Sequence, residues 1–177
     1  MKNRLHKSYF VAIGIISAVL LTALSGCGES RGYTTESLFD EQITSVYVEM
    51  FDNRTFERGV EYELTDALAK RIEAATPYKI VSSRDRADTV ISGYISNEQK
   101  AVLTAERQTG RPMEKEITLT AVVNWKNIRN GKMLIDNKQV VAAASFSEWQ
   151  QQGTAYGSAL AANKLAKGIV ELMENPW

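Results

Sequence analysis

Three segments in the second half of the chain alternate apolar and polar residues, which is typical of β-strands with one buried face. The clearest covers residues 116–128 and places five side chains inward: Ile117, Leu119, Ala121, Val123 and Trp125. In residues 89–105 the alternation places four apolar side chains on one face of the predicted strand: Ile91, Ile95, Ala101 and Leu103. The third segment covers residues 132–146. Between the last two, Asn130 and Gly131 predict a type I′ hairpin turn with positive φ at both residues. We therefore expect a long antiparallel meander with one apolar face and one solvated face.

Two other segments repeat apolar residues every three or four positions, which predicts amphipathic helices over residues 58–75 and 154–173. The first ends before Pro77, because the residue that precedes a proline disfavours helix. Residues 43–51 alternate and predict a first strand with three apolar residues on one face: Val46, Val48 and Met50. Residues 78–82 predict a short second strand.

The order strand, helix, strand, meander and helix predicts an α+β fold. We expect a two-layer sandwich in which both helices pack on one face of a mixed four- to five-stranded sheet. Residues 84–88 form a charged turn before the meander. Asp85 and Asp88 could be metal ligands, but arginines stand beside them, so we interpret the segment as a turn whose charges pair with each other.

The N-terminal segment has the layout of an export signal, with positive residues followed by an uncharged, mostly apolar run from Ser8 to Gly26. The run ends in Leu-Ser-Gly-Cys at residues 24–27, a lipobox. We predict that residues 1–26 are cleaved and that Cys27 becomes a lipid-modified N-terminus, a membrane anchor of several acyl chains. The alternative is an uncleaved transmembrane helix, since about 20 residues suffice to span a bilayer. Residues 27–41 then form a polar tether, and residues 42–177 form a single domain.

Composition narrows the chemistry of the mature chain. The chain's one histidine is His6, within the signal, and its one cysteine is Cys27. The mature protein therefore lacks the groups for Ser-His-Asp or Cys-His catalysis and for a His/Cys zinc site. We expect no cofactor, no metal and no enzymatic activity, although a carboxylate-dependent enzyme stays an alternative. The absence of a long charge run argues against a nucleic-acid partner.

Four local motifs follow the lipobox: Gly-Tyr at residues 32–33, Phe-Asp-Asn-Arg-Thr-Phe at 51–56, Glu-Tyr-Glu-Leu-Thr at 61–65 and Arg-Ala-Asp-Thr-Val-Ile-Ser-Gly at 86–93. Together they resemble the LPS-assembly lipoprotein family, where LPS is lipopolysaccharide. The resemblance covers about residues 32–171. It implies a lipoprotein on the periplasmic side of the outer membrane that plugs the LPS-export β-barrel, helps it assemble and contacts LPS. The implied partners are that barrel protein, LPS and, through the anchor, the membrane.

Two features of the sequence agree with this resemblance. Gly28, rather than Asp, follows the lipidated cysteine, which permits delivery to the outer membrane. The solvated face of the sheet is rich in Thr, Ser and Asn and can meet a polar barrel lumen. An alternative is a non-catalytic lipoprotein that serves as accessory or pilot of another secretion or efflux machine, since such a protein would share the anchor and the fold.

Basic residues gather near the two expected hairpin tips and are candidate contacts for LPS phosphates. They are Arg107 and Arg111 at one tip, and Lys126, Arg129 and Lys132 at the other. The alternative is that these charges are simply solvated, or that Glu106 and Glu114 pair with the arginines of the first tip. The two tips can also lie at opposite ends of the sheet.

Overall fold

The computed structural model describes residues 38–174, so Cys27 and most of the expected tether lie outside the described residues. Six strands form one mixed sheet in the order β3-β1-β4-β5-β6, with β2 also paired to β4. The strands are β1 (Ser45–Val48), β2 (Asp52–Asn53), β3 (Lys79–Ile80), β4 (Thr89–Ala105), β5 (Pro112–Asn127) and β6 (Met133–Ser147). The helices are α2 (Val60–Ala75) and α3 (Thr154–Glu171), with short 3₁₀ turns η1 (Arg84–Arg86) and η2 (Glu148–Gln150).

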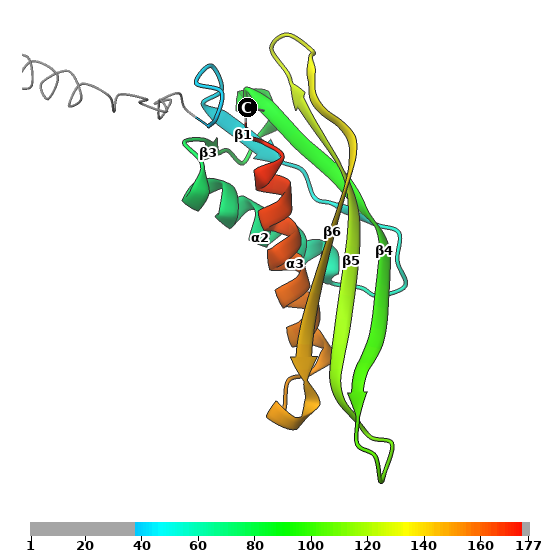
Figure 1. The fold of residues 1–177 in the computed structure, drawn as a ribbon. Helices are drawn as coiled ribbons and strands as arrows, with labels where there is room; N and C mark the ends of the chain where they lie inside the picture. The colour runs from blue at the N-terminus through cyan, green and yellow to red at the C-terminus, as the bar shows by residue number, and fades with distance from the viewer. Residues whose placement is uncertain (1–37, 175–177) are drawn as a thin grey trace, which may run out of the picture. The chain divides into compact units, whose positions relative to one another are not determined.

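The α+β class with two helices and a mixed open sheet is confirmed. The strands β1, β2 and β3 add in parallel, whereas β4, β5 and β6 form the predicted antiparallel meander. One strand more than expected is present, because Asp52 and Asn53, which lie beyond the predicted first strand, pair with Tyr94 and Ile95 of β4. Helix α3 packs along β5 and β6 and also against α2 (Figure 1).

The core lies between these helices and the meander. All five side chains that the β5 pattern places inward are buried. Helix α3 approaches the sheet through small residues, and a Cβ added at its Gly157 would come within 2.4 Å of the Phe146 ring. Close packing of this kind is sensitive to a single added methyl group.

The first strand is shorter than predicted. It ends at Val48, and Met50 does not join the apolar face but is 50% exposed. Phe51 is buried instead, against the Gly93 position of β4, where a Cβ would meet its ring at 2.7 Å. The alternation therefore breaks after Val48, where the chain leaves β1 to reach the edge position of β2.

The predicted single phase of the first meander strand is wrong beyond Ile95. The pairing of β4 with β5 shifts between Ile95 and Asn97, which inserts one extra residue and exchanges the two faces of the strand. Ala101 and Leu103, which we expected inward, are exposed, and the side chain of Glu98 is turned inward opposite Leu119.

The β5–β6 connection is longer than a two-residue hairpin. Gly131 has the expected positive φ of 71°, but Asn130 does not share it, so the turn is not type I′. The backbone N–H of Asn127 bonds the Lys132 carbonyl, and the Asn127 side chain accepts the N–H groups of Arg129 and Asn130. Asparagine side chains stabilise such a five-residue loop by replacing backbone acceptors.

Candidate functional site

The two basic tips lie at opposite ends of the meander. The β4–β5 loop with Arg107 and Arg111 is at the bottom of the view, and the β5–β6 loop with Arg129 is at the top (Figure 1). Strand β5, which joins them, has 16 residues and therefore spans roughly 50 Å. The five candidate LPS contacts therefore form two separate sites.

At the β5–β6 tip, Arg129 forms an ion pair with Asp88, which precedes β4. Asp88 is nearly fully buried, and its other carboxylate oxygen accepts the backbone N–H groups of Thr44 and Ser45 and the Thr44 hydroxyl. Our interpretation of residues 84–88 as a self-paired turn is therefore wrong for Asp88, whose partners come from β1 and from the distant loop. Lys126 and Lys132 form no ion pair with any described residue.

The hydrogen bonds to Asp88 control its ionisation. Burial alone would raise the pKa of this carboxyl, but the bonds from Thr44 and Ser45 outweigh burial and lower the pKa to about 2. The carboxylate is therefore charged at neutral pH and stabilises the start of β1, the start of β4 and the β5–β6 loop together.

The β4–β5 tip has free basic groups. Neither Arg107 nor Arg111 forms an ion pair with a described residue, and Glu106 accepts the Thr109 hydroxyl at 2.6 Å rather than an arginine. Beside this tip is a groove of about 320 Å³, whose lining includes Arg111, Met113 and the largely exposed Trp149 of η2. An ion pair of 2.5 Å between Lys115 of β5 and Glu148 attaches η2 to the sheet.

A second hollow, of about 400 Å³, lies between β4 and the loop that follows β2. The Arg54 guanidinium lies 3.4 Å from the centroid of the Tyr94 ring, a cation–π contact. Phe56, on the same loop, is fully exposed. The loop is attached to β4 by an ion pair of 2.5 Å between Glu57 and Lys100.

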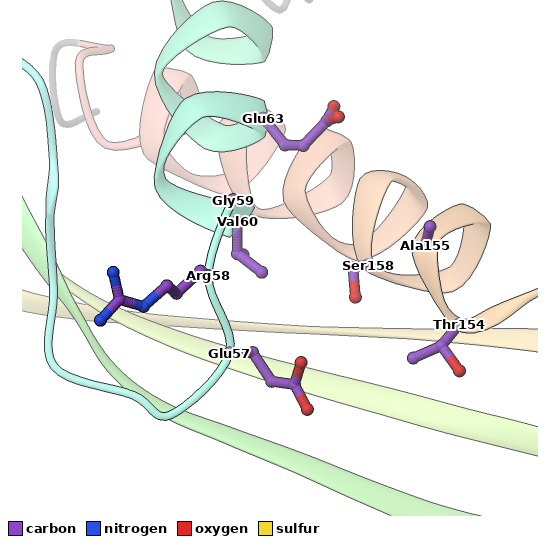
Figure 2. A pocket seen from close by; sticks show the side chains of 8 residues that line it. All are labelled: Glu57, Arg58, Gly59, Val60, Glu63, Thr154, Ala155 and Ser158. Carbon is purple, nitrogen blue, oxygen red and sulfur yellow. The ribbon is translucent and has the colours of Figure 1, made fainter.

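A third hollow of about 260 Å³ separates the first turns of α2 and α3 (Figure 2). Glu57 faces Thr154 and Ser158 across it, whereas the Arg58 side chain points away (Figure 2). Within residues 38–174 no three His, Cys, Asp or Glu residues are close enough to hold a metal ion. In the same described part of the chain, no helix is long and apolar enough to cross a membrane.

The face of the meander opposite the apolar side is polar and carries few charges. Because β4 and β6 pair with β5 in register, its side chains form rows across the three strands. The central rows are Ser92–Asn124, Tyr94–Val122–Gln139, Asn97–Thr120–Val141 and Gln99–Thr118–Ala143. No formal charge occurs among these side chains, which agrees with the predicted polar face.

A model of the lipopolysaccharide-assembly LptE family matches residues 43–175. This match covers most of the chain and nearly all of the described residues. The chain belongs to the LptE family. As a member of this non-catalytic accessory family it is an LPS-assembly lipoprotein. Among curated proteins, none matches the sequence.

Solved structures show similar folds at low sequence identity. Uncharacterized lipoprotein B from Nitrosomonas europaea aligns with a TM-score of 0.50 and 12% identity, over 73% of this chain and 81% of that protein. Rare lipoprotein B from Shewanella oneidensis aligns with a TM-score of 0.45 and 13% identity, over 73% and 93%. Hypothetical protein CT253 from Chlamydia trachomatis gives 0.49 and 14%, over 72% and 94%. The first of these supports the fold of the LptE-family domain.

Sequence reasoning missed two features of these sites. The exposure of Trp149 beside Arg111 depends on how η2 folds back on β5, although an isolated tryptophan among glutamines is a signal of exposure. The Asp88–Arg129 pair joins residues 41 positions apart, and no local pattern marks it.

Proposed function

We propose that this chain is an outer-membrane lipoprotein that plugs the LPS-export β-barrel and helps it assemble. In this proposal both helices form one layer of a two-layer sandwich, which leaves the opposite sheet face free. The broad polar face of β4, β5 and β6, whose four central rows contain no charged side chain, carries the proposal, because such a surface suits a water-lined barrel wall better than a lipid or an apolar partner.

Family membership supports the class of process in which the protein acts. The proposed anchor is Cys27, which would hold the domain on the periplasmic side of the outer membrane. The described chain begins close to β1, and the Asp88 contacts place that end beside the β5–β6 tip. An anchored domain would therefore direct this tip toward the membrane surface and the β4–β5 tip away from it.

Direct LPS contact is assigned to the β4–β5 tip. Arg107 and Arg111 are free for phosphate groups there, and Trp149 supplies an apolar surface in the adjoining groove. At the other tip Arg129 is already paired with Asp88, so it is less available for a ligand phosphate.

Plugging is tested by the conductance of the barrel in a planar bilayer. The purified barrel–lipoprotein complex should conduct poorly, and the barrel freed of this lipoprotein should open a large pore. Equal conductance with and without the lipoprotein would contradict the plug, even if the two proteins co-purify.

A further inference from the structure

The outer edge of β4 is open over its second half. Parallel pairing with β1 and β2 covers β4 only as far as Ile95, whose carbonyl accepts the Arg54 N–H at 3.0 Å. Beyond that bond, within the described chain, residues 97–105 pair with β5 alone. Apart from the inward-turned Glu98, the other eight of these nine residues are exposed, including Val102 at 54%.

The direction of the free backbone groups follows from the observed bonds. The Ile91 and Ile95 carbonyls point away from β5, toward the β1–β2 side of the sheet. Up to Ile95, the odd-numbered residues of β4 therefore direct their backbone N–H and C=O groups to that side. The extra residue at the register shift moves this orientation to even residues. Glu98, Lys100 and Val102 therefore direct their N–H and C=O groups away from β5 toward the open edge.

The two edges of the sheet are interrupted at different places: on β4 the register shifts lie before Asn97 and after Val102, so residues 97–102 pair with β5 without a break. On β6 the Lys164 ammonium of α3 donates to the outward carbonyl of Ala143 at 2.9 Å, and Asn137 interrupts the strand with a positive φ of 46°. Lysine side chains and bulges are the usual means of blocking strand addition at an edge. On β4 the corresponding lysine, Lys100, is drawn across the helix side by Glu57 at 2.5 Å and Glu98 at 3.5 Å.

Glu98 explains why Lys100 stays in that position. The Glu98 side chain is only 3% exposed, and neither of its oxygens has a hydrogen-bond partner among the described residues. A buried carboxylate of this kind depends on a nearby cation for stabilisation. The ammonium of Lys100 is therefore committed to the two glutamates, and no charged side chain covers the open backbone between Lys100 and Thr104.

We propose that this open edge of β4 receives an added β-strand from the barrel partner. The proposal rests on the proposed function for the identity of the protein that carries the strand. The added strand would lie on the same side of β4 as β2, beside the residues that follow Ile95. Its first side chain would enter the 400 Å³ hollow beside Phe56. We infer an extended, uncharged segment, because four of the residues that would flank it are uncharged: Gln99, Ala101, Val102 and Leu103.

The test compares the full lipoprotein alone with its purified barrel complex by amide hydrogen exchange. Exchange of the outward Lys100 and Val102 amides should slow about tenfold or more in the complex, because added backbone hydrogen bonds protect them. The outward amide of Ser145 on β6, which lies outside the four central rows of the polar face, should change much less. Equal behaviour of the two edges in an intact complex would overturn the added strand but leave the plug proposal standing. Failure to obtain any barrel complex would instead remove the proposed function and this inference with it.

Matched proline variants provide the second measurement. Val102→Pro removes an outward N–H at the open edge of β4, and Ser145→Pro does the same on β6, where the serine is also exposed and lies outside the four central rows of the polar face. Neither change removes a bond to β5. Val102→Pro should reduce retention of the barrel about five- to tenfold, whereas Ser145→Pro should match the parent. Equal retention in two folded variants would contradict the proposal, and the exchange measurement decides the question if either variant fails to fold.

Discussion

Arg129 in the β5–β6 loop forms an ion pair with Asp88, 41 positions earlier, and so attaches the meander tip to the beginning of the sheet. The same carboxylate accepts hydrogen bonds from Thr44 and Ser45, so one buried side chain connects three segments. Only the carboxylate of this pair is buried, since the Arg129 side chain is 70% exposed, but removing the partners of a buried charge is more costly than losing a fully exposed ion pair. Asp88 is therefore expected to contribute to the stability of this end of the domain.

The lowered pKa of Asp88 predicts a specific pH dependence. A carboxyl whose pKa is about 2 when folded and near 3.9 when unfolded stabilises the fold fully above about pH 4, and this contribution is lost as the pH falls toward 2. Urea unfolding should therefore show Asp88→Asn about 2 kcal/mol less stable than the parent at pH 6, with the difference shrinking toward pH 2. Asp85→Asn, at an exposed position, is the control. A difference that stays constant from pH 6 to pH 2 would show that the charge of Asp88 is not responsible.

Close packing of α3 on β6 predicts a strong effect of one methyl group. Gly157→Ala would bring its Cβ within 2.4 Å of Phe146 and within 3.0 Å of Ile117, so the helix must shift. We expect a loss of about 1–3 kcal/mol in the free energy of unfolding. The comparison change Gly153→Ala meets no atom within 4 Å and, at the N-cap of α3, should cost less, no more than about 1 kcal/mol. Equal melting temperatures for the two variants would contradict the observed contact between α3 and β6.

How far the sequence predicts this fold depends on whether the deciding contact is local. The β5 face from Ile117 to Trp125 follows a strict alternation, and the pattern predicts its burial correctly. The exposure of Ala101 and Leu103 follows from a register shift against β5, which is a property of two strands and leaves no clear mark on one of them. The short strand β2 forms because β4 offers it an edge, despite turn-favouring residues at Asp52 and Asn53.

The candidate site shows the same division. Basic residues near two loops are visible in the sequence. The distance between the two loops follows from the length of the predicted strand that joins them. The engagement of Arg129 by Asp88 and the position of Trp149 beside Arg111 depend on tertiary contacts. The sequence therefore predicts which charges are available, and the folded chain determines which of them remain free.

Separate charge reversals at the tips test where LPS binds. Arg107→Glu with Arg111→Glu should weaken binding to LPS micelles at low salt, because both guanidinium groups are free and Arg111 lines the same groove as Trp149. Lys126→Glu with Lys132→Glu should have a much smaller effect, and Arg129 is left unchanged so that its pair with Asp88 survives. If both double variants fold and bind as the parent does, neither tip contacts LPS. The plug proposal would then stand without a direct lipid contact.

The lipid anchor is tested by one substitution. Cys27 is the only cysteine of the chain, so no other thiol can accept the diacylglyceryl group. Cys27→Ala should abolish metabolic labelling with palmitate and leave an unprocessed precursor of higher mass. Palmitate label that persists in Cys27→Ala would show that acylation occurs elsewhere.

Association with the LPS-export barrel is tested most directly by capturing this lipoprotein from detergent-solubilised outer membranes. We expect one large β-barrel protein in a one-to-one ratio, identified by mass spectrometry, with the ratio unchanged after gel filtration. An accessory of another secretion or efflux machine would instead retain the components of that machine. Purification of the lipoprotein from the outer membrane without any barrel protein, or with a barrel of a different machine, would contradict the proposed association.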